Sequence, residues 1–243
     1  MERLRRRILA LGGIALTGPV LAGLPRAARA AGGDGARLRI GIVGSGRVGG
    51  TLGSVWAKAG HQVMLSSRDI EHDRALAARL GPNASAGTPR EAAAFGDVVV
   101  VSVPYRALPD VGKALADLIR DKVVIDTCNP FVGRDGEIAS WAREKGAGLA
   151  SAELLPGARI VRAFNAVGYL RMGVAHERPG QLGMPIAGDD AEAVALASRL
   201  VRDIGFEPVL VGGLEMGRYL MPGTPLAGEK TPDEIRRIAA GLR

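Results

Sequence analysis

The chain has 243 residues, of which 47% are hydrophobic and 23% charged, a balance typical of a globular protein and not of a disordered or fibrous one. Its net charge of +7 resides mainly in residues 1–30, which hold six arginines and one glutamate, and only 4% of the residues are aromatic. We therefore expect no nucleic-acid partner, which would need basic residues interleaved with stacking aromatics. A single cysteine, Cys128, excludes an internal disulfide, and with three scattered histidines we expect no metal site.

The N-terminal residues 1–30 are similar to signal peptides of the twin-arginine export route. Arg5–Arg7 precede a moderately apolar stretch over 8–24, and Ala28–Ala30 offer an A-x-A cleavage signal before Ala31. The apolar stretch is short and interrupted by glycines for a stable membrane span. We expect an exported, periplasmic protein whose first partner is the export machinery. The alternative is an uncleaved extension on a cytoplasmic protein.

The stretch over 37–68 organises the rest of the chain. Residues 37–43 pass from polar–apolar alternation to an apolar run and predict a strand, which leads directly into a G-x-G-x-x-G spacing over 44–49. A helix is expected over 47–59 and a second strand over 61–65. A glycine spacing alone is weak evidence, but between a strand and a helix, and followed by a second strand within about 30 residues, it predicts dinucleotide binding.

Each glycine of this turn has a separate predicted role. Gly44 allows the tight turn out of the strand, Gly46 lets the backbone approach a pyrophosphate, and Gly49 lets the helix pack closely on the sheet. The free N–H groups at the start of the helix would then face the diphosphate. We expect the dinucleotide to contact Gly44, Ser45, Gly46, Arg47, Val48 and Gly49.

The end of the second strand indicates which dinucleotide binds. NAD-binding units usually carry an acidic residue there for the ribose 2′-hydroxyl, whereas this chain has Ser66, Ser67 and Arg68. Two hydroxyl donors and a guanidinium suit a 2′-phosphate, so we expect NADP(H) as the cofactor. The alternative is that Arg68 is a solvated surface arginine, with Asp69 capping the next segment.

Downstream, hydrophobic periodicity and turn signals predict alternating helices and strands. Helices are expected over 71–80, from a capping box at Thr88, over 110–120 and 137–145, after a cap by Asp189, and from a capping box at Thr231. Strands are expected over 97–101, 122–126, 159–163, 184–187 and 206–211. This alternation predicts a Rossmann-like, doubly wound α/β fold with a mostly parallel sheet in a single domain over 37–215, followed by a C-terminal tail and helix over 216–243.

Two strand ends and one loop are candidates for the reactive half of the site. Ser102, Val103 and Pro104 follow one strand, and the segment 127–130 follows the next. Ligands of open α/β sheets bind beyond the carboxyl ends of strands, so the nicotinamide is expected there, although a plain turn set by Pro104 explains the first segment equally well. The stretch over 168–183 lacks clear periodicity and is predicted to be a mobile loop over the site.

These segments together resemble the family of NADP oxidoreductases that depend on the deazaflavin coenzyme F420, and the reductase domain of the STEAP metalloreductases is similar too. The resemblance rests on the glycine turn with the segment 56–61, on the strand ends at 66–68 and 102–104, and on the segments 126–130 and 163–165. It implies that Ser45–Val48, Ser67 and Arg68 hold the adenosine half, with its 2′-phosphate. It also implies that the nicotinamide pocket is lined by Ser102, Val103, Pro104, Asn129 and Ala163.

The expected activity is hydride transfer between NADPH and a deazaflavin- or flavin-like acceptor. Such a transfer needs positioning of two rings and little proton transfer, which agrees with the lack of a lysine, a histidine or an acidic pair in the strand-end segments. No catalytic side chain is therefore assigned. Two alternatives stay open: a reductase of a small carbonyl or imine substrate, and a non-catalytic NADP(H)-binding protein. A small-molecule redox partner is expected, and homo-oligomerisation is left open.

Overall fold

The computed structural model describes residues 36–242, so the predicted signal segment lies outside the described residues. Within them, eight strands form one sheet in the order β3-β2-β1-β4-β5-β6-β7-β8. The strands are β1 (Arg39–Val43), β2 (Gln62–Ser66), β3 (Ala84–Ala86), β4 (Val98–Val101), β5 (Val123–Asp126), β6 (Arg159–Arg162), β7 (Gly183–Gly188) and β8 (Glu207–Gly212). Neighbouring strands are parallel except β6 and β7. The order of β1 to β6 is that of a Rossmann sheet, which confirms the predicted fold class.

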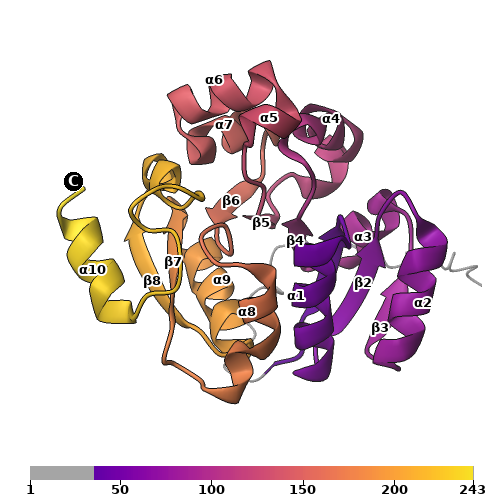
Figure 1. The fold of residues 1–243 in the computed structure, drawn as a ribbon. Coiled ribbons are helices and arrows are strands. Elements are labelled where there is room, and N and C mark those ends of the chain that lie inside the picture. Colours follow the sequence, from indigo (N-terminus) through magenta and orange to yellow (C-terminus); the bar gives the residue numbers. More distant parts are fainter. Residues whose placement is uncertain (1–35, 243) are drawn as a thin grey trace, which may run out of the picture. The chain divides into compact units, whose positions relative to one another are not determined.

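Helices cover both faces of this sheet (Figure 1). One face packs against α1 (Arg47–Lys58), α2 (Ile70–Leu80), α8 (Tyr169–Val174) and α9 (Ala191–Asp203). The other packs against α3 (Pro89–Phe95), α4 (Leu108–Ile119), α6 (Glu137–Lys145) and α7 (Ala147–Leu154), with the short α5 (Val132–Asp135) beside α6 and a 3-10 turn, η2 (Tyr105–Ala107), before α4. The central strands are therefore buried on both sides, which explains the continuous apolar run of β4.

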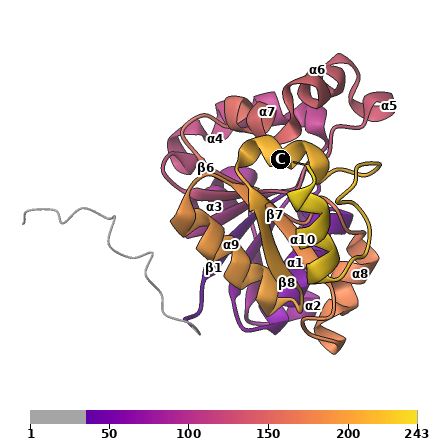
Figure 2. The same ribbon diagram turned by 90° about the vertical axis from the view of Figure 1, so that its left-hand side faces the viewer.

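The C-terminal residues pack on the same sheet. A 3-10 turn, η4 (Leu214–Tyr219), and α10 (Pro232–Ala240) pack on β7 and β8, and Figure 2 shows α10 beside these two strands. Their buried contacts form a third apolar cluster that includes Val211, Leu220 and Ile235. Residues 216–242 thus belong to the compact unit that carries the Rossmann sheet.

Local signals in the sequence explain where several helices begin. Thr88 and Thr231 cap α3 and α10 in complete capping boxes with a glutamate three residues later, as predicted. The cap of α9 was assigned to the wrong residue, because Asp190 accepts the hydrogen bond from the N–H of Ala193. Asp189 instead accepts a hydrogen bond from the N–H of Leu214.

The predicted loop over 168–183 is wrong in its first half. Residues 169–177 form α8 and a 3-10 turn, η3 (Ala175–Glu177), and α8 packs beside α1. The sequence shows no helical periodicity here, because the segment is short and buries little more than Met172 and Ala175. The strand β3 and the helix α7 were also not predicted. None of the helices in residues 36–242 is long and apolar enough to cross a membrane.

Candidate functional site

The glycine turn between β1 and α1 has the geometry that the spacing predicts. Gly44 has a φ of +104°, in the left-handed region that favours glycine. A Cβ on Gly49 would collide with the carbonyl oxygen of Gly44, so the helix approaches the strand this closely only because it lacks a side chain there. A Cβ on Gly46 would meet no atom within 4 Å, so the space in front of Gly46 is open. The backbone at Gly46 is therefore open to close approach by a ligand, as a diphosphate site requires.

The backbone N–H groups in the first turn of α1 have no acceptor within the helix and lie at that open space. The hydrogen bond that opens the helix runs from the N–H of Gly50 to the carbonyl of Gly46 at 2.7 Å, so the N–H groups before Gly50 have no acceptor within the helix. No side chain caps α1, and its first turn has no acidic residue. Arg47 is exposed and Val48 half-buried. The helix dipole adds positive potential, so the turn fits an anionic diphosphate.

Ser66 fixes this turn and is not available to a ligand. Its side chain is fully buried, and its hydroxyl donates to the carbonyl of Ile42 at 2.6 Å. Its own carbonyl accepts hydrogen bonds from the N–H groups of Gly44 at 2.9 Å and Ser45 at 3.0 Å. The expectation that the Ser66 hydroxyl donates to a 2′-phosphate is therefore corrected, since this hydroxyl holds β2 against β1.

The hydroxyls of Ser45 and Ser67 both hydrogen-bond to one residue that the sequence analysis did not identify, Asp73. Asp73, in the first turn of α2, is fully buried and accepts hydrogen bonds from the hydroxyls of Ser45 and Ser67. The Oγ of Ser67 lies 2.8 Å from Oδ2 of Asp73. Asp73 shares a helix face with the buried Ala77, four residues later, which is the one signal in the sequence that a carboxylate points inward there.

Arg68 stands free at the end of β2. Its side chain is exposed, and among residues 36–242 it takes part in no hydrogen bond or ion pair. Asp69, which follows it, caps α2 by accepting a hydrogen bond from the N–H of His72 at 3.0 Å, so this carboxylate is not paired with the guanidinium. The five N–H donors of Arg68 are available to a phosphate.

The strand-end residues predicted for the nicotinamide lie at one edge of the sheet. Ser102, Val103 and Pro104 are half-buried directly after β4, and Asn129 is half-buried after β5, its parallel neighbour. The N–H of Val103 donates to the Sγ of Cys128 at 3.4 Å, which connects the two segments. The structure therefore brings these four residues together at the carboxyl ends of the central strands, where ligands of such sheets bind.

Behind Asn129 lies a buried ion pair that the sequence analysis did not identify. Arg162 at the end of β6 and Asp126 at the end of β5 are both fully buried, and Nη1 of Arg162 lies 2.5 Å from Oδ2 of Asp126. Nη2 of Arg162 donates to the side-chain oxygen of Asn129 at 3.4 Å. The side-chain amide of Asn129 in turn donates to the carbonyl of Asn165 at 2.8 Å. The Asp126–Arg162 pair thus helps to fix the orientation of the Asn129 side chain.

Ala163 lies outside the predicted pocket lining. Its side chain is fully buried in the apolar core beneath α1 and α9, so the expectation that it lines the nicotinamide pocket is corrected. The next residue, Phe164, has a φ of +66°, an unusual conformation for a residue with a side chain, and packs edge-on against Trp56.

The two weakly acidic side chains near this edge are held protonated. Burial, and secondarily the charge of Asp126, raises the pKa of the Tyr105 hydroxyl well above its usual value, and the same two causes raise the pKa of the Cys128 thiol. Neither is a source of protons at neutral pH. In the part of the chain that the structure describes, no group of three His, Cys, Asp or Glu residues could hold a metal ion.

A Rossmann sheet with an open, uncapped helix N-terminus behind a glycine turn defines a dinucleotide-binding protein. Residues 39–130 match the model of the family described as NADP oxidoreductase coenzyme F420-dependent. The F420-dependent NADP reductase of Methanothermobacter thermautotrophicus is 30% identical over 205 residues, which cover 78% of this chain and 87% of that protein. The chain therefore belongs to the family of coenzyme F420-dependent NADP oxidoreductases, and the prediction of an NADP-dependent oxidoreductase is confirmed.

Two further comparisons show similarity of sequence or of fold. The metalloreductase STEAP3 of Rattus norvegicus is 28% identical over 180 residues, covering 74% of this chain and 35% of that protein. Among solved structures, the hypothetical protein SMa0349 of Sinorhizobium meliloti superposes with a TM-score of 0.67 at 22% identity, over 81% of this chain and 96% of that one. The second comparison supports the fold alone.

The buried ion pair generates a stability prediction. Replacing Asp126 by alanine leaves the Arg162 guanidinium buried without its counter-ion, which should lower the free energy of unfolding by about 3–5 kcal/mol, measured by urea denaturation. The control is Asp117→Ala, which breaks the exposed Asp117–Arg90 pair and should cost no more than about 1 kcal/mol. Similar losses in the two variants would contradict the assignment of Asp126–Arg162 as a buried pair.

Proposed function

We propose that the protein transfers hydride between NADPH and a planar, anionic acceptor of the deazaflavin or flavin type. The observation that carries this proposal is a surface at the carboxyl ends of β4 and β5 that combines exposed apolar side chains with arginines. Phe131 and Val132 are 42% and 50% exposed, although both are large and apolar. Arg134 and Arg106 lie beside them.

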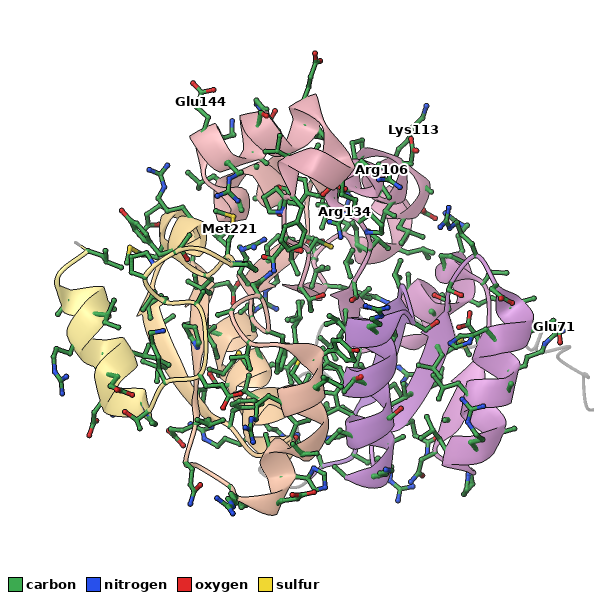
Figure 3. All side chains as sticks on the ribbon, viewed as in Figure 1. Glu71, Arg106, Lys113, Arg134, Glu144 and Met221 are labelled. Atoms are coloured by element: carbon green, nitrogen blue, oxygen red, sulfur yellow. The ribbon has the colours of Figure 1, made fainter. Side chains whose placement is uncertain are left out.

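We call Arg106 and residues 131–134 the acceptor surface. Its apolar side chains suit a planar ring, and its arginines suit an acidic tail on that ring. The guanidinium of Arg134 lies over the Phe131 ring at 5.0 Å, and Nη1 of Arg106 donates to the carbonyl of Arg134 at 2.5 Å. Figure 3 shows the Arg106 and Arg134 side chains close together. Burial opposes the charge on Asp135, but hydrogen bonds from Arg134 and two backbone N–H groups lower its pKa, so it neutralises Arg134. Arg106 then leaves the surface net positive.

The residues around this surface favour transfer without a proton relay. NADPH would supply the hydride when bound. Gly46–Val48 would hold its diphosphate by backbone N–H groups, Arg68 its 2′-phosphate, and Ser102–Pro104 with Asn129 its nicotinamide. Tyr105 and Cys128 stay protonated and buried, so neither assists a carbonyl or imine reduction as a general acid that exchanges with solvent. Transfer between two rings requires mainly their relative placement, which these strand ends provide.

The cofactor part of the proposal predicts a selective loss. Replacing Arg68 by alanine removes the guanidinium proposed to bind the 2′-phosphate and should weaken NADPH binding by roughly ten- to a hundredfold, with NADH binding nearly unchanged, as measured by calorimetry. Arg74→Ala is the matched control, since Arg74 is an exposed arginine in the following helix, α2, that pairs with Glu71. Equal losses for NADPH and NADH would contradict the role of Arg68.

The acceptor part is tested by following NADPH oxidation at 340 nm with coenzyme F420, with FMN, and with riboflavin, which has the ring but no acidic tail. Turnover should occur with a tailed acceptor, and Arg106→Ala should raise the KM for that acceptor about tenfold without changing the KM for NADPH. Riboflavin should be a poor acceptor that is insensitive to the substitution. Lys113→Ala is the control for a simple loss of surface charge, because Lys113 is an exposed cation on α4.

Two results would overturn this part of the proposal. Turnover only with carbonyl or imine compounds would make the protein a reductase of small organic substrates. Tight binding of NADP(H) without turnover of any acceptor would make it a binding protein.

We further propose that the chain is exported by the twin-arginine route, which moves folded proteins and so allows the cofactor to bind before export. The support is the arrangement of residues 5–30 in the sequence. Mass spectrometry of the protein from its native cells should find Ala31 as the first residue, and replacing Arg5–Arg7 by lysines should block its release to the periplasm. A mature protein that retains Met1 would contradict export.

A further inference from the structure

Asp135, the last residue of α5, is a buried carboxylate next to the acceptor surface. Its side chain is fully buried, whereas that of its partner Arg134 is 40% exposed. The proposed function uses Asp135 only as the counter-charge of Arg134. Backbone N–H groups nevertheless donate to both of its oxygens. A counter-charge alone needs neither burial nor backbone donors, so these contacts point to an effect of Asp135 on the chain around it.

The two backbone hydrogen bonds connect the segments that follow β4 and β5. Oδ1 of Asp135 accepts a hydrogen bond from the N–H of Arg106 in η2 at 3.4 Å, and Oδ2 accepts one from the N–H of Phe131 at 3.1 Å. The segment with Arg106 continues from residues 102–104, and Phe131 lies two residues after Asn129. One carboxylate therefore links the two segments that carry the proposed nicotinamide residues and the acceptor surface.

The guanidinium of Arg134 extends this link to Asn129. Nε of Arg134 lies 2.9 Å from Oδ1 of Asp135, and Nη2 lies 2.7 Å from Oδ2. Nη2 also donates to the backbone carbonyl of Asn129 at 2.8 Å. Because a two-bond pair fixes the plane of a guanidinium, the position of the Asn129 backbone depends on Asp135 as well. The side chain of Asn129 is oriented separately, by Arg162.

This arrangement bears on the distance between the two rings. In the proposed function the nicotinamide lies against residues 102–104 and Asn129, and the acceptor ring lies against Phe131. Hydride transfer requires the two rings at short range, and a displacement of about 1 Å can cost about a hundredfold in rate. Asp135 holds the backbone of Arg106 and one edge of Arg134, so the exposed ends of both arginines can still adapt to an acidic tail.

We infer that Asp135 is a positioning residue that sets the distance between the nicotinamide and the acceptor ring, because it holds the segments after β4 and β5 together. This inference rests on the proposed function. It predicts that a change at Asp135 acts on the hydride-transfer step, whether or not the acceptor has an acidic tail, and leaves the affinity for NADPH intact.

The test is Asp135→Asn, which keeps the size of the side chain but turns one of its two acceptor atoms into a donor. That atom can no longer accept the backbone N–H that it faces. The rate constant of NADPH oxidation, followed at 340 nm in a single turnover, should fall at least about tenfold with a tailed acceptor and with riboflavin alike. The dissociation constant of NADPH, measured by calorimetry, should stay within about twofold.

The matched control is Asp97→Asn. Asp97 also accepts a hydrogen bond from a backbone N–H, that of Arg39 at 3.2 Å, and pairs with the guanidinium of the same residue. This pair lies at the amino ends of β1 and β4, at the opposite edge of the sheet from the site. The variant should lower the melting temperature and leave the rate constant of NADPH oxidation unchanged.

A second variant covers the case that Asp135→Asn does not fold. Arg134→Lys keeps an exposed positive charge but removes the planar fork that spans Asp135 and the carbonyl of Asn129. It should lower the rate constant about fivefold with both kinds of acceptor, with the KM for the tailed acceptor little changed.

The outcomes separate this inference from the proposed function. A changed KM for the tailed acceptor with an unchanged rate constant would show that Asp135 acts only on the charge of the acceptor surface, and would overturn the inference. A parallel loss of NADPH affinity, or an equal loss of rate in Asp97→Asn, would overturn it as well, since the effect would then be general destabilisation. Failure of the unchanged protein to oxidise NADPH with any of these acceptors would instead refute the proposed function itself.

Discussion

The close approach of α1 to the end of β1 is the constraint on which the rest of the site depends. Gly49 allows this approach, because a Cβ there would collide with the carbonyl oxygen of Gly44, and the carbonyl of Ser66 holds the turn through the N–H groups of Gly44 and Ser45. A Cβ on Gly44 would in turn collide with the carbonyl oxygen of Ser102 after β4. The approach leaves the first N–H groups of α1 facing open space in front of Gly46. The anion site that we propose at this place thus depends on backbone packing, and side chains only refine it.

Buried polar groups next to each half of the proposed site orient the side chains around it. Asp73 sets the hydroxyls on the adenosine side, and the Asp126–Arg162 pair sets Asn129 on the nicotinamide side. Both sets of groups are buried and hydrogen-bonded, so each fixes a neighbouring side chain in one orientation. The acceptor surface has a different character, since its arginines are exposed and can adapt to a ligand.

The glycine turn and the mostly parallel α/β sheet follow from the sequence, because glycine spacing and strand periodicity encode them directly. Which serine hydroxyls are free does not, since it depends on partners distant in the chain: Ser66 donates to Ile42, and Ser67 to Asp73. The Asp126–Arg162 pair does not follow from the sequence either, because its two members belong to different strands and meet only through the register of β5 and β6. The helix α8 was missed because six residues carry too little periodicity.

The central claim is that this turn and Arg68 bind a phosphorylated pyridine nucleotide. Calorimetric titration of the folded protein with NADP⁺, and in parallel with NAD⁺ and with 2′-phosphoadenosine, tests it most directly. The account predicts saturable one-site binding of NADP⁺, competed by 2′-phosphoadenosine, with weaker binding of NAD⁺. The absence of any saturable heat with NADP⁺ at millimolar concentration would contradict the account.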